Sequence, residues 1–276
     1  MGLGTHSLHR LLSPAARLRL LESAYELGVR YFDTAPSYGA GLAEREIGRL
    51  ARGRRSTLIL ATKFGIEPSR LATLLPSGAL LTAAAGAALR AIGLRRSPRE
   101  PKRDYGVATL RRSTEDSLRR LRTDYLDILY LHAPTVDSLG DAEGLADAMH
   151  ALMKAGKVRR IGLAGELPEC LAIARRHPAL ADVLQMNVPA DARGLPATCA
   201  LPAEAAVAVW EFPAPRDGAK QPPLREVLEG LDRALPGRLM VLSTRHEAIV
   251  REAARLLSSR EPRSVYNAPS PKAQRP

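Results

Sequence analysis

The chain has 276 residues, 45% of them hydrophobic and 25% charged, which is enough to bury the core of one large α/β domain. Its net charge of +12 would suit a nucleic-acid partner, but the arginines are spread over predicted helices without the interleaved aromatics of a single-strand binder. We therefore expect no nucleic-acid role. Cys170 and Cys199 lie far apart, so neither a CxxC zinc motif nor a disulfide framework is expected, which favours a reducing, cytoplasmic compartment.

Residues 71–94 are the stretch that most resembles a membrane span. Pro76, Gly78 and Arg90 interrupt it, and alanine is only weakly apolar, so we expect no membrane segment here. The first ten residues also lack the basic-then-apolar pattern of a signal peptide. We interpret 71–94 as part of a surface insertion.

Strands and helices are predicted to alternate along the chain. A short apolar start at 2–5 precedes an amphipathic helix at 14–28, which follows Ser13 and ends at Gly28. The remaining predicted elements are strand 29–34, helix 41–53, strand 56–63, helix 107–122, strand 125–132, helix 141–155, strand 158–165, helix 167–177, strands 181–187 and 205–212, helix 222–234, strand 238–243 and helix 244–258.

Eight strands with intervening helices are typical of βαβ units and predict a closed parallel (β/α)8 TIM barrel, since open sheets usually have fewer strands. No helix is evident between the sixth and seventh strands, where the Pro/Ala-rich stretch 188–203 is interpreted as a loop or a poor helix. We expect a single barrel domain over 1–258, a long loop at 64–105 after the third strand, and a disordered tail at 259–276.

In such barrels the functional groups lie at the C-terminal ends of the strands. The predicted ends carry ionisable or amide side chains from four different strands, namely Asp33, Lys63, His132, Gln185 and Asn187. Each has an ordinary alternative: Asp33 as a helix cap, His132 as a satisfied core histidine, Lys63 as a solvated strand end. Their joint placement on one rim favours a site.

Three segments, "FDTAPSYG" (32–39), "LILATKFG" (58–65) and "RTDYLDILYLHAP" (122–134), resemble the aldo-keto reductases, and the resemblance extends over most of the chain. It implies a (β/α)8 barrel that reduces small-molecule carbonyls with NADPH, with NADH also possible. The same family pattern implies that Asp33, Tyr38, Lys63 and His132 form the catalytic group.

The chemistry of that group can be stated from the residues. Reducing a carbonyl leaves charge on oxygen and needs a proton donor, but a free phenol with a pKa of about 10 is a poor acid–base group. We expect Lys63 to lower the pKa of Tyr38, Asp33 to hold Lys63, and His132 to orient the carbonyl.

The resemblance also implies a set of cofactor-binding positions, which are Thr5, Asp33, Gln185, Phe212, Ser243, Thr244 and Arg245. Phe212 would stack on the nicotinamide, and the segment 243–245 would meet the 2′-phosphate at a helix N-terminus. Ala164 and Gly165 stand where the family often has a Ser-Asn pair. His6 and Trp210 are expected to line the substrate pocket.

Two alternatives remain open on sequence grounds. The barrel could bind the cofactor without catalysis and act as a regulatory subunit, or it could perform a redox-neutral elimination with Tyr38 or Lys63 as base. The substrate class extends over ketones, sugars and aldehydes. We expect a monomer or a small homo-oligomer, with no metal.

Overall fold

The computed structural model describes residues 1–68, 102–188, 206–209, 223–234 and 237–258. Within these residues the sheet is a closed barrel in which β1 to β8 follow one another in chain order and all pairs are parallel. The strands are β1 (Gly2–Gly4), β2 (Tyr31–Asp33), β3 (Ile59–Phe64), β4 (Leu126–His132), β5 (Val158–Gly165), β6 (Val183–Val188), β7 (Ala206–Val209) and β8 (Met240–Ser243). The predicted (β/α)8 fold is confirmed.

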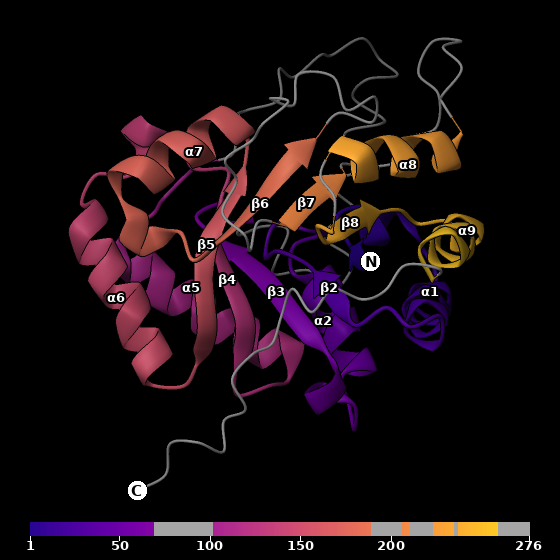
Figure 1. Ribbon diagram of the computed structural model, residues 1–276. Coiled ribbons are helices and arrows are strands. Elements are labelled where there is room, and N and C mark those ends of the chain that lie inside the picture. Colours follow the sequence, from indigo (N-terminus) through magenta and orange to yellow (C-terminus); the bar gives the residue numbers. More distant parts are fainter. Residues whose placement is uncertain (69–101, 189–205, 210–222, 235–236, 259–276) are drawn as a thin grey trace, which may run out of the picture.

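Helices surround the barrel on the outside (Figure 1). They are α1 (Pro14–Glu26), α2 (Leu42–Leu50), α5 (Val107–Leu121), α6 (Ala142–Lys154), α7 (Leu167–Arg176), α8 (Leu224–Ala234) and α9 (Glu247–Ser258). All of them lie at positions expected from the sequence. At α1 the start signal is visible, because Ser13 Oγ accepts a hydrogen bond from Ala16 N at 3.3 Å and Pro14 follows directly.

The core has two layers. The larger lies between the barrel and its helices and is built mainly from leucine, isoleucine and alanine. The smaller fills the inside of the barrel and contains two aromatic residues, Tyr31 and Tyr130, among small and branched side chains. This inner layer forms the floor beneath the C-terminal rim of the strands.

The N-terminal end of the barrel is fixed by a buried carboxylate on β4. Asp127 accepts hydrogen bonds from Arg55 and Arg159, both at 2.7 Å, and from Leu60 N at 2.9 Å. The two guanidinium groups also stack on the Tyr125 ring, at 3.7 and 4.1 Å from its centroid. This cluster joins β3, β4 and β5 at the end opposite the rim.

The strand register determines which side chains meet on the rim. Asp33 pairs with Gly4 on one side and with Ala61 on the other. His132 pairs with Ala164, which pairs with Gln185. Side chains at paired positions of parallel strands point the same way, so His132, Ala164 and Gln185 face the same interior.

Several sequence expectations fall outside the described residues, namely segment 71–94, most of the loop at 64–105, the stretch 189–203 and the tail 259–276. The two ends of the long loop do meet, since Ile66 and Arg103 form an antiparallel bridge. Among the described residues, no helix combines the length and apolar character that crossing a bilayer requires.

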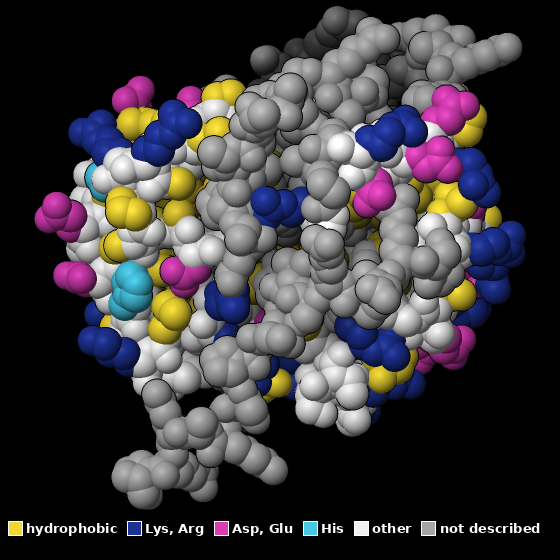
Figure 2. Space-filling model, in the orientation of Figure 1, with side chains coloured by type: hydrophobic (Ala, Val, Ile, Leu, Met, Phe, Trp, Pro, Cys, Tyr) yellow, Lys and Arg dark blue, Asp and Glu magenta, His cyan; other side chains and the backbone are white. Residues whose placement is uncertain are grey.

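Basic side chains are dispersed over the described part of the face in Figure 2, with acidic ones between them. They do not gather into one patch there. This distribution agrees with the interpretation of the +12 charge as an arginine-rich composition.

Candidate active site

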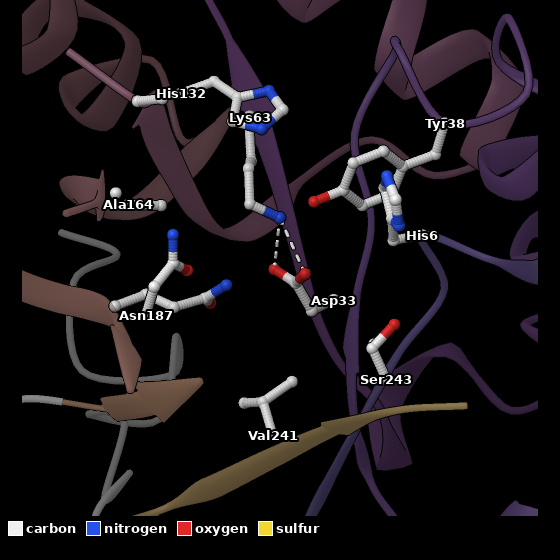
Figure 3. A pocket seen from close by; sticks show the side chains of 13 residues that line it. His6, Asp33, Tyr38, Lys63, His132, Ala164, Asn187, Val241 and Ser243 are labelled. Carbon is white, nitrogen blue, oxygen red and sulfur yellow. Dashed lines mark hydrogen bonds and ion pairs between the residues drawn. The ribbon is translucent and has the colours of Figure 1, made fainter. Parts of the chain in front are cut away.

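A pocket lies at the C-terminal ends of the strands (Figure 3). It is lined by Gly4, His6, Asp33, Tyr38, Lys63, His132, Ala133, Ala164, Gly165, Gln185, Asn187, Val241 and Ser243. The structure thus brings together the four residues expected to be catalytic, along with His6, Gln185 and Ser243 from the other expected positions.

Lys63 and Asp33 form a buried ion pair in this pocket. The Lys63 Nζ atom donates to both Asp33 carboxylate oxygens at 2.7 Å and to the Thr34 carbonyl oxygen at 2.9 Å. The side chains come from the ends of the neighbouring strands β3 and β2. Burial alone would lower the pKa of Lys63, but Asp33 and Tyr38 outweigh that effect, so its pKa lies above the ordinary value. Lys63 is therefore held as an ammonium.

Tyr38 projects into the pocket from the turn that follows β2. Its backbone N–H donates to the Ala35 carbonyl at 3.0 Å, and positive φ angles at Gly39, Ala40 and Gly41 then turn the chain into α2. The Tyr38 hydroxyl points toward the Lys63 ammonium group (Figure 3), whose Nζ atom lies 4.9 Å from the ring centroid. The His6 ring packs edge-on against the Tyr38 ring, with the two ring centroids 5.0 Å apart.

The direction of the Tyr38 pKa differs from the sequence expectation. Lys63 does lower it, as expected, but burial of the phenol is the larger effect and the pKa is raised. Tyr38 as a whole residue is only 7% exposed. Tyr38 is therefore a protonated donor over a wide pH range, and the role of Lys63 is to limit how far burial raises the pKa.

His132 lies at the end of β4, with its ring centroid 5.8 Å from that of Tyr38. Burial holds the pKa of His132 well below its ordinary value, with smaller contributions from the charge of Lys63 and from His6 and Arg103. Its imidazole is therefore neutral, and Nδ1 has no hydrogen-bond partner among the described residues. The Tyr105 hydroxyl donates to the His132 carbonyl oxygen at 2.7 Å and fixes this end of the strand.

The remaining cofactor positions from the sequence are not all in the pocket. Thr5 donates its hydroxyl hydrogen to the Asp33 carbonyl at 2.9 Å, so it supports the strand end that carries Asp33. Thr244 Oγ1 accepts from His246 N at 3.2 Å, and Arg245 lies beside it in the turn before α9. Neither Thr244 nor Arg245 is among the described residues that line the pocket. Phe212 and Trp210 lie outside the described residues.

Other pocket residues had weaker sequence signals. Asn187, which the sequence predicts on the rim at the end of β6, lines the pocket and donates from Nδ2 to Glu166 Oε1 at 2.9 Å. Val241, on β8, was not singled out. Tyr31 and Tyr130, directly beneath the rim, are not evident from the sequence, because both lie in strands whose residues are all buried, so no alternation marks the inward-facing positions. Only the register shows that they face the barrel interior.

Comparisons with known proteins agree with this geometry. The model of the aldo/keto reductase family matches residues 1–201. D-threo-aldose 1-dehydrogenase from a Pseudomonas species is 33% identical over 184 residues, which cover 63% of this chain and 51% of that protein. The chain spans about half the length of the curated relatives it matches.

Solved structures share the fold. The holo form of an aldo-keto reductase from Bacillus halodurans superposes with a TM-score of 0.67 at 18% identity, covering 96% of this chain and 90% of that one. An aldo/keto reductase from Klebsiella pneumoniae, solved in complex with NADP and acetate, gives a TM-score of 0.63 at 22% identity. The match covers 93% of this chain and 84% of that one.

Proposed function

Because the chain belongs to the aldo/keto reductase family, we propose that it reduces a small aldehyde or ketone with NADPH, or oxidises the matching alcohol. NADH is the alternative cofactor. The observation that carries the proposal is one pocket that holds a protonated phenol, a charged lysine paired with a carboxylate, and a neutral imidazole. Such a set can protonate a carbonyl oxygen, because the phenol supplies the proton and the lysine stabilises the phenolate that remains.

The residues present fit a nicotinamide in this pocket. Gln185 offers an amide at the pocket wall, and Ser243 has a buried Oγ atom without a hydrogen-bond partner among the described residues. Ala164, between His132 and Gln185 in the strand register, contributes only a methyl group and leaves space there. Gln185 and Ser243 would hold the cofactor, and Thr244 and Arg245 would lie nearer its phosphates at the start of α9.

When bound, the nicotinamide supplies or accepts the hydride. In the reductive direction His132 donates a hydrogen bond to the substrate carbonyl and orients it toward Tyr38. Tyr38 then transfers its phenolic proton to the carbonyl oxygen. Lys63 stabilises the phenolate that remains, while Asp33 keeps the lysine charged and in place. In oxidation Tyr38 takes the proton back.

The test replaces the phenol and leaves the ring. Tyr38→Phe should lower kcat for NADPH-dependent reduction by about 10²- to 10⁴-fold, because the proton donor is lost. The Kd for NADPH, measured by calorimetry, should stay within about twofold of wild type. The substrate panel should contain 4-nitrobenzaldehyde, simple ketones and aldoses, the last because of the name of the Pseudomonas relative.

Tyr25→Phe is the matched control, since its hydroxyl bonds to Thr57 on the outside of the barrel, 3.1 Å away. It should keep wild-type kcat. Undiminished turnover in Tyr38→Phe would refute the catalytic assignment. Binding of NADPH without turnover of any carbonyl would favour a regulatory barrel, and failure to bind either nicotinamide cofactor would favour redox-neutral chemistry.

A further inference from the structure

Two tyrosines form a polar column inside the barrel, beneath the pocket. Tyr31 on β2 and Tyr130 on β4 are 2% and 0% exposed. Their hydroxyl oxygens lie 3.2 Å apart, and the Tyr31 hydroxyl lies 3.2 Å from Gln185 Oε1. The column therefore ends on the Gln185 carboxamide, which lines the pocket from β6.

The number of hydrogens that each hydroxyl can donate determines which group is the donor in each hydrogen bond of this column. A phenol has a single hydrogen to donate. Tyr31 uses it toward Gln185 Oε1, so in the contact between the two phenols Tyr130 is the donor and Tyr31 the acceptor. The order Tyr130, Tyr31, Gln185 follows, with each hydroxyl donating to the next group.

The sequence makes room for the column with small residues. A Cβ atom at Gly2 would lie 2.6 Å from Tyr31 Cδ1, closer than side-chain carbons approach in proteins. Ala61 and Ala164 complete the walls of the same inner cluster. Burying a phenol costs free energy unless its hydroxyl is bonded, and the hydrogen bond to Gln185 Oε1 satisfies the Tyr31 hydroxyl here.

We propose that Tyr31, supported by Tyr130, is a positioning residue that fixes the orientation of the Gln185 carboxamide. With Oε1 held from below, Nε2 is directed toward the pocket, where it donates to the carboxamide oxygen of the nicotinamide. The inference rests on the proposed function, since it concerns how the cofactor ring is held. The inference adds a means of aligning the nicotinamide ring. Ala164 and Gly165, next to Gln185 in the sheet, have no polar side chain that could share this role.

The experiment measures binding, using three probes by calorimetry. They are NADP⁺, its 3-acetylpyridine analogue, which keeps the carbonyl but lacks the amide nitrogen, and 2′-phospho-ADP-ribose, which lacks the nicotinamide. Tyr31→Phe should weaken the first two about 3- to 10-fold, the range expected for one hydrogen bond. The third should bind within about twofold of wild type.

Companion variants separate positioning from general loss of structure. Gln185→Leu should weaken the first two probes as much as Tyr31→Phe does, and the double variant no further, because both changes remove one contact. Tyr130→Phe should have a smaller effect, since Tyr31 keeps its hydrogen for Gln185. Tyr25→Phe should bind all three probes like wild type.

Three results would overturn the inference. They are equal weakening of 2′-phospho-ADP-ribose in Tyr31→Phe, additive losses with Gln185→Leu, or unchanged NADP⁺ binding in a folded Tyr31→Phe. If Tyr31→Phe weakens the binding of NADP⁺ but not of the acetyl analogue, the Gln185 carboxamide presents Oε1 to the nicotinamide instead of Nε2. The proposed orientation of Gln185 would then be wrong. Failure of the wild-type protein to bind any probe would instead refute the proposed function along with it.

Discussion

At the residue scale, the pocket keeps its groups in complementary charge states. Lys63 and Asp33 are paired as opposite charges, and Tyr38 and His132 are both held neutral by burial. The four side chains together thus carry no net charge. This neutrality is compatible with the proposed uncharged carbonyl substrate, in which charge would develop on oxygen only during the reaction.

The Lys63–Asp33 pair allows a test by double-mutant cycle. Lys63→Met should lower the free energy of unfolding by about 3–5 kcal/mol, because it leaves the Asp33 side chain, which is 6% exposed, without its partner. Asp33→Asn combined with Lys63→Met should cost clearly less than the sum of the single changes. Urea denaturation measures all four proteins, and simple additivity would show that the two groups are not coupled.

His132 gives the fold a pH dependence with a definite sign. The pKa of His132 is below 6.5 in the folded state, so below about pH 6.5 the unfolded chain binds more protons at this position. The free energy of unfolding therefore decreases as the pH decreases. Between about pH 6.5 and 5.5 the loss should approach about 1 kcal/mol. His132→Gln should remove this part of the dependence, whereas the exposed His246→Gln should keep it. The measurement is urea denaturation at several pH values. If the free energy of unfolding changed equally with pH in wild type and in His132→Gln, the prediction would be contradicted.

At the element scale, β5 and β6 approach each other too closely for a side chain at one position. A Cβ atom at Gly162 would lie 2.0 Å from the Val183 carbonyl oxygen, on the strand to which Gly162 is paired. The spacing between β5 and β6 at this position is therefore possible only because residue 162 is a glycine. The same glycine also leaves space for Tyr130, whose Cε1 atom would lie 3.0 Å from the added Cβ.

Gly162→Ala should therefore destabilise the protein by about 2 kcal/mol or more, through strain in the β5–β6 ladder. Gly230→Ala is the matched control, because it lies inside α8 with no atom within 4 Å of the added Cβ. It should be neutral or stabilise by up to about 1 kcal/mol. Thermal and urea unfolding compare the two, and tolerance of Gly162→Ala would show that the strands can separate locally.

The elements themselves could be predicted from the sequence because their signals are local. Ser13 and Pro14 indicate the start of α1, and Gly28, with φ of 89°, follows its end. The direction of side chains within the strands could not be predicted in the same way. In β4 all seven residues from Leu126 to His132 are buried, so no alternation separates the interior from the helix-facing side. Tyr130 was missed for this reason.

At the scale of the whole molecule, the two ends of the barrel have different tasks. The pocket occupies the C-terminal ends of the strands, and the Asp127 cluster occupies the N-terminal ends of β3, β4 and β5. The meeting of Asp33, Lys63, His132 and Gln185 in one pocket could be predicted because strand ends converge in any such barrel, whereas Tyr38, in the turn after β2, was expected only from the family resemblance. The balance that raises the pKa of Tyr38 could not, since it depends on how completely the folded chain covers the phenol.

Asp127→Asn should separate stability from binding. It should lower the free energy of unfolding by about 2 kcal/mol or more, since it leaves two partly buried guanidinium groups without their carboxylate. The Kd for NADPH should change by less than about twofold. A large change in Kd at unchanged stability would show that the two ends are not independent.

The order of the site along the chain has one further consequence. Asp33, Tyr38, Lys63 and His132 all come from the first half of the sequence, whereas Gln185, Asn187 and Ser243 come from the second. Under the proposed function, substitutions confined to the second half would change which dinucleotide is preferred and would leave the proposed proton-transfer residues intact. For directed evolution, a library limited to residues 185–245 would then explore cofactor choice with the proposed acid–base residues held constant.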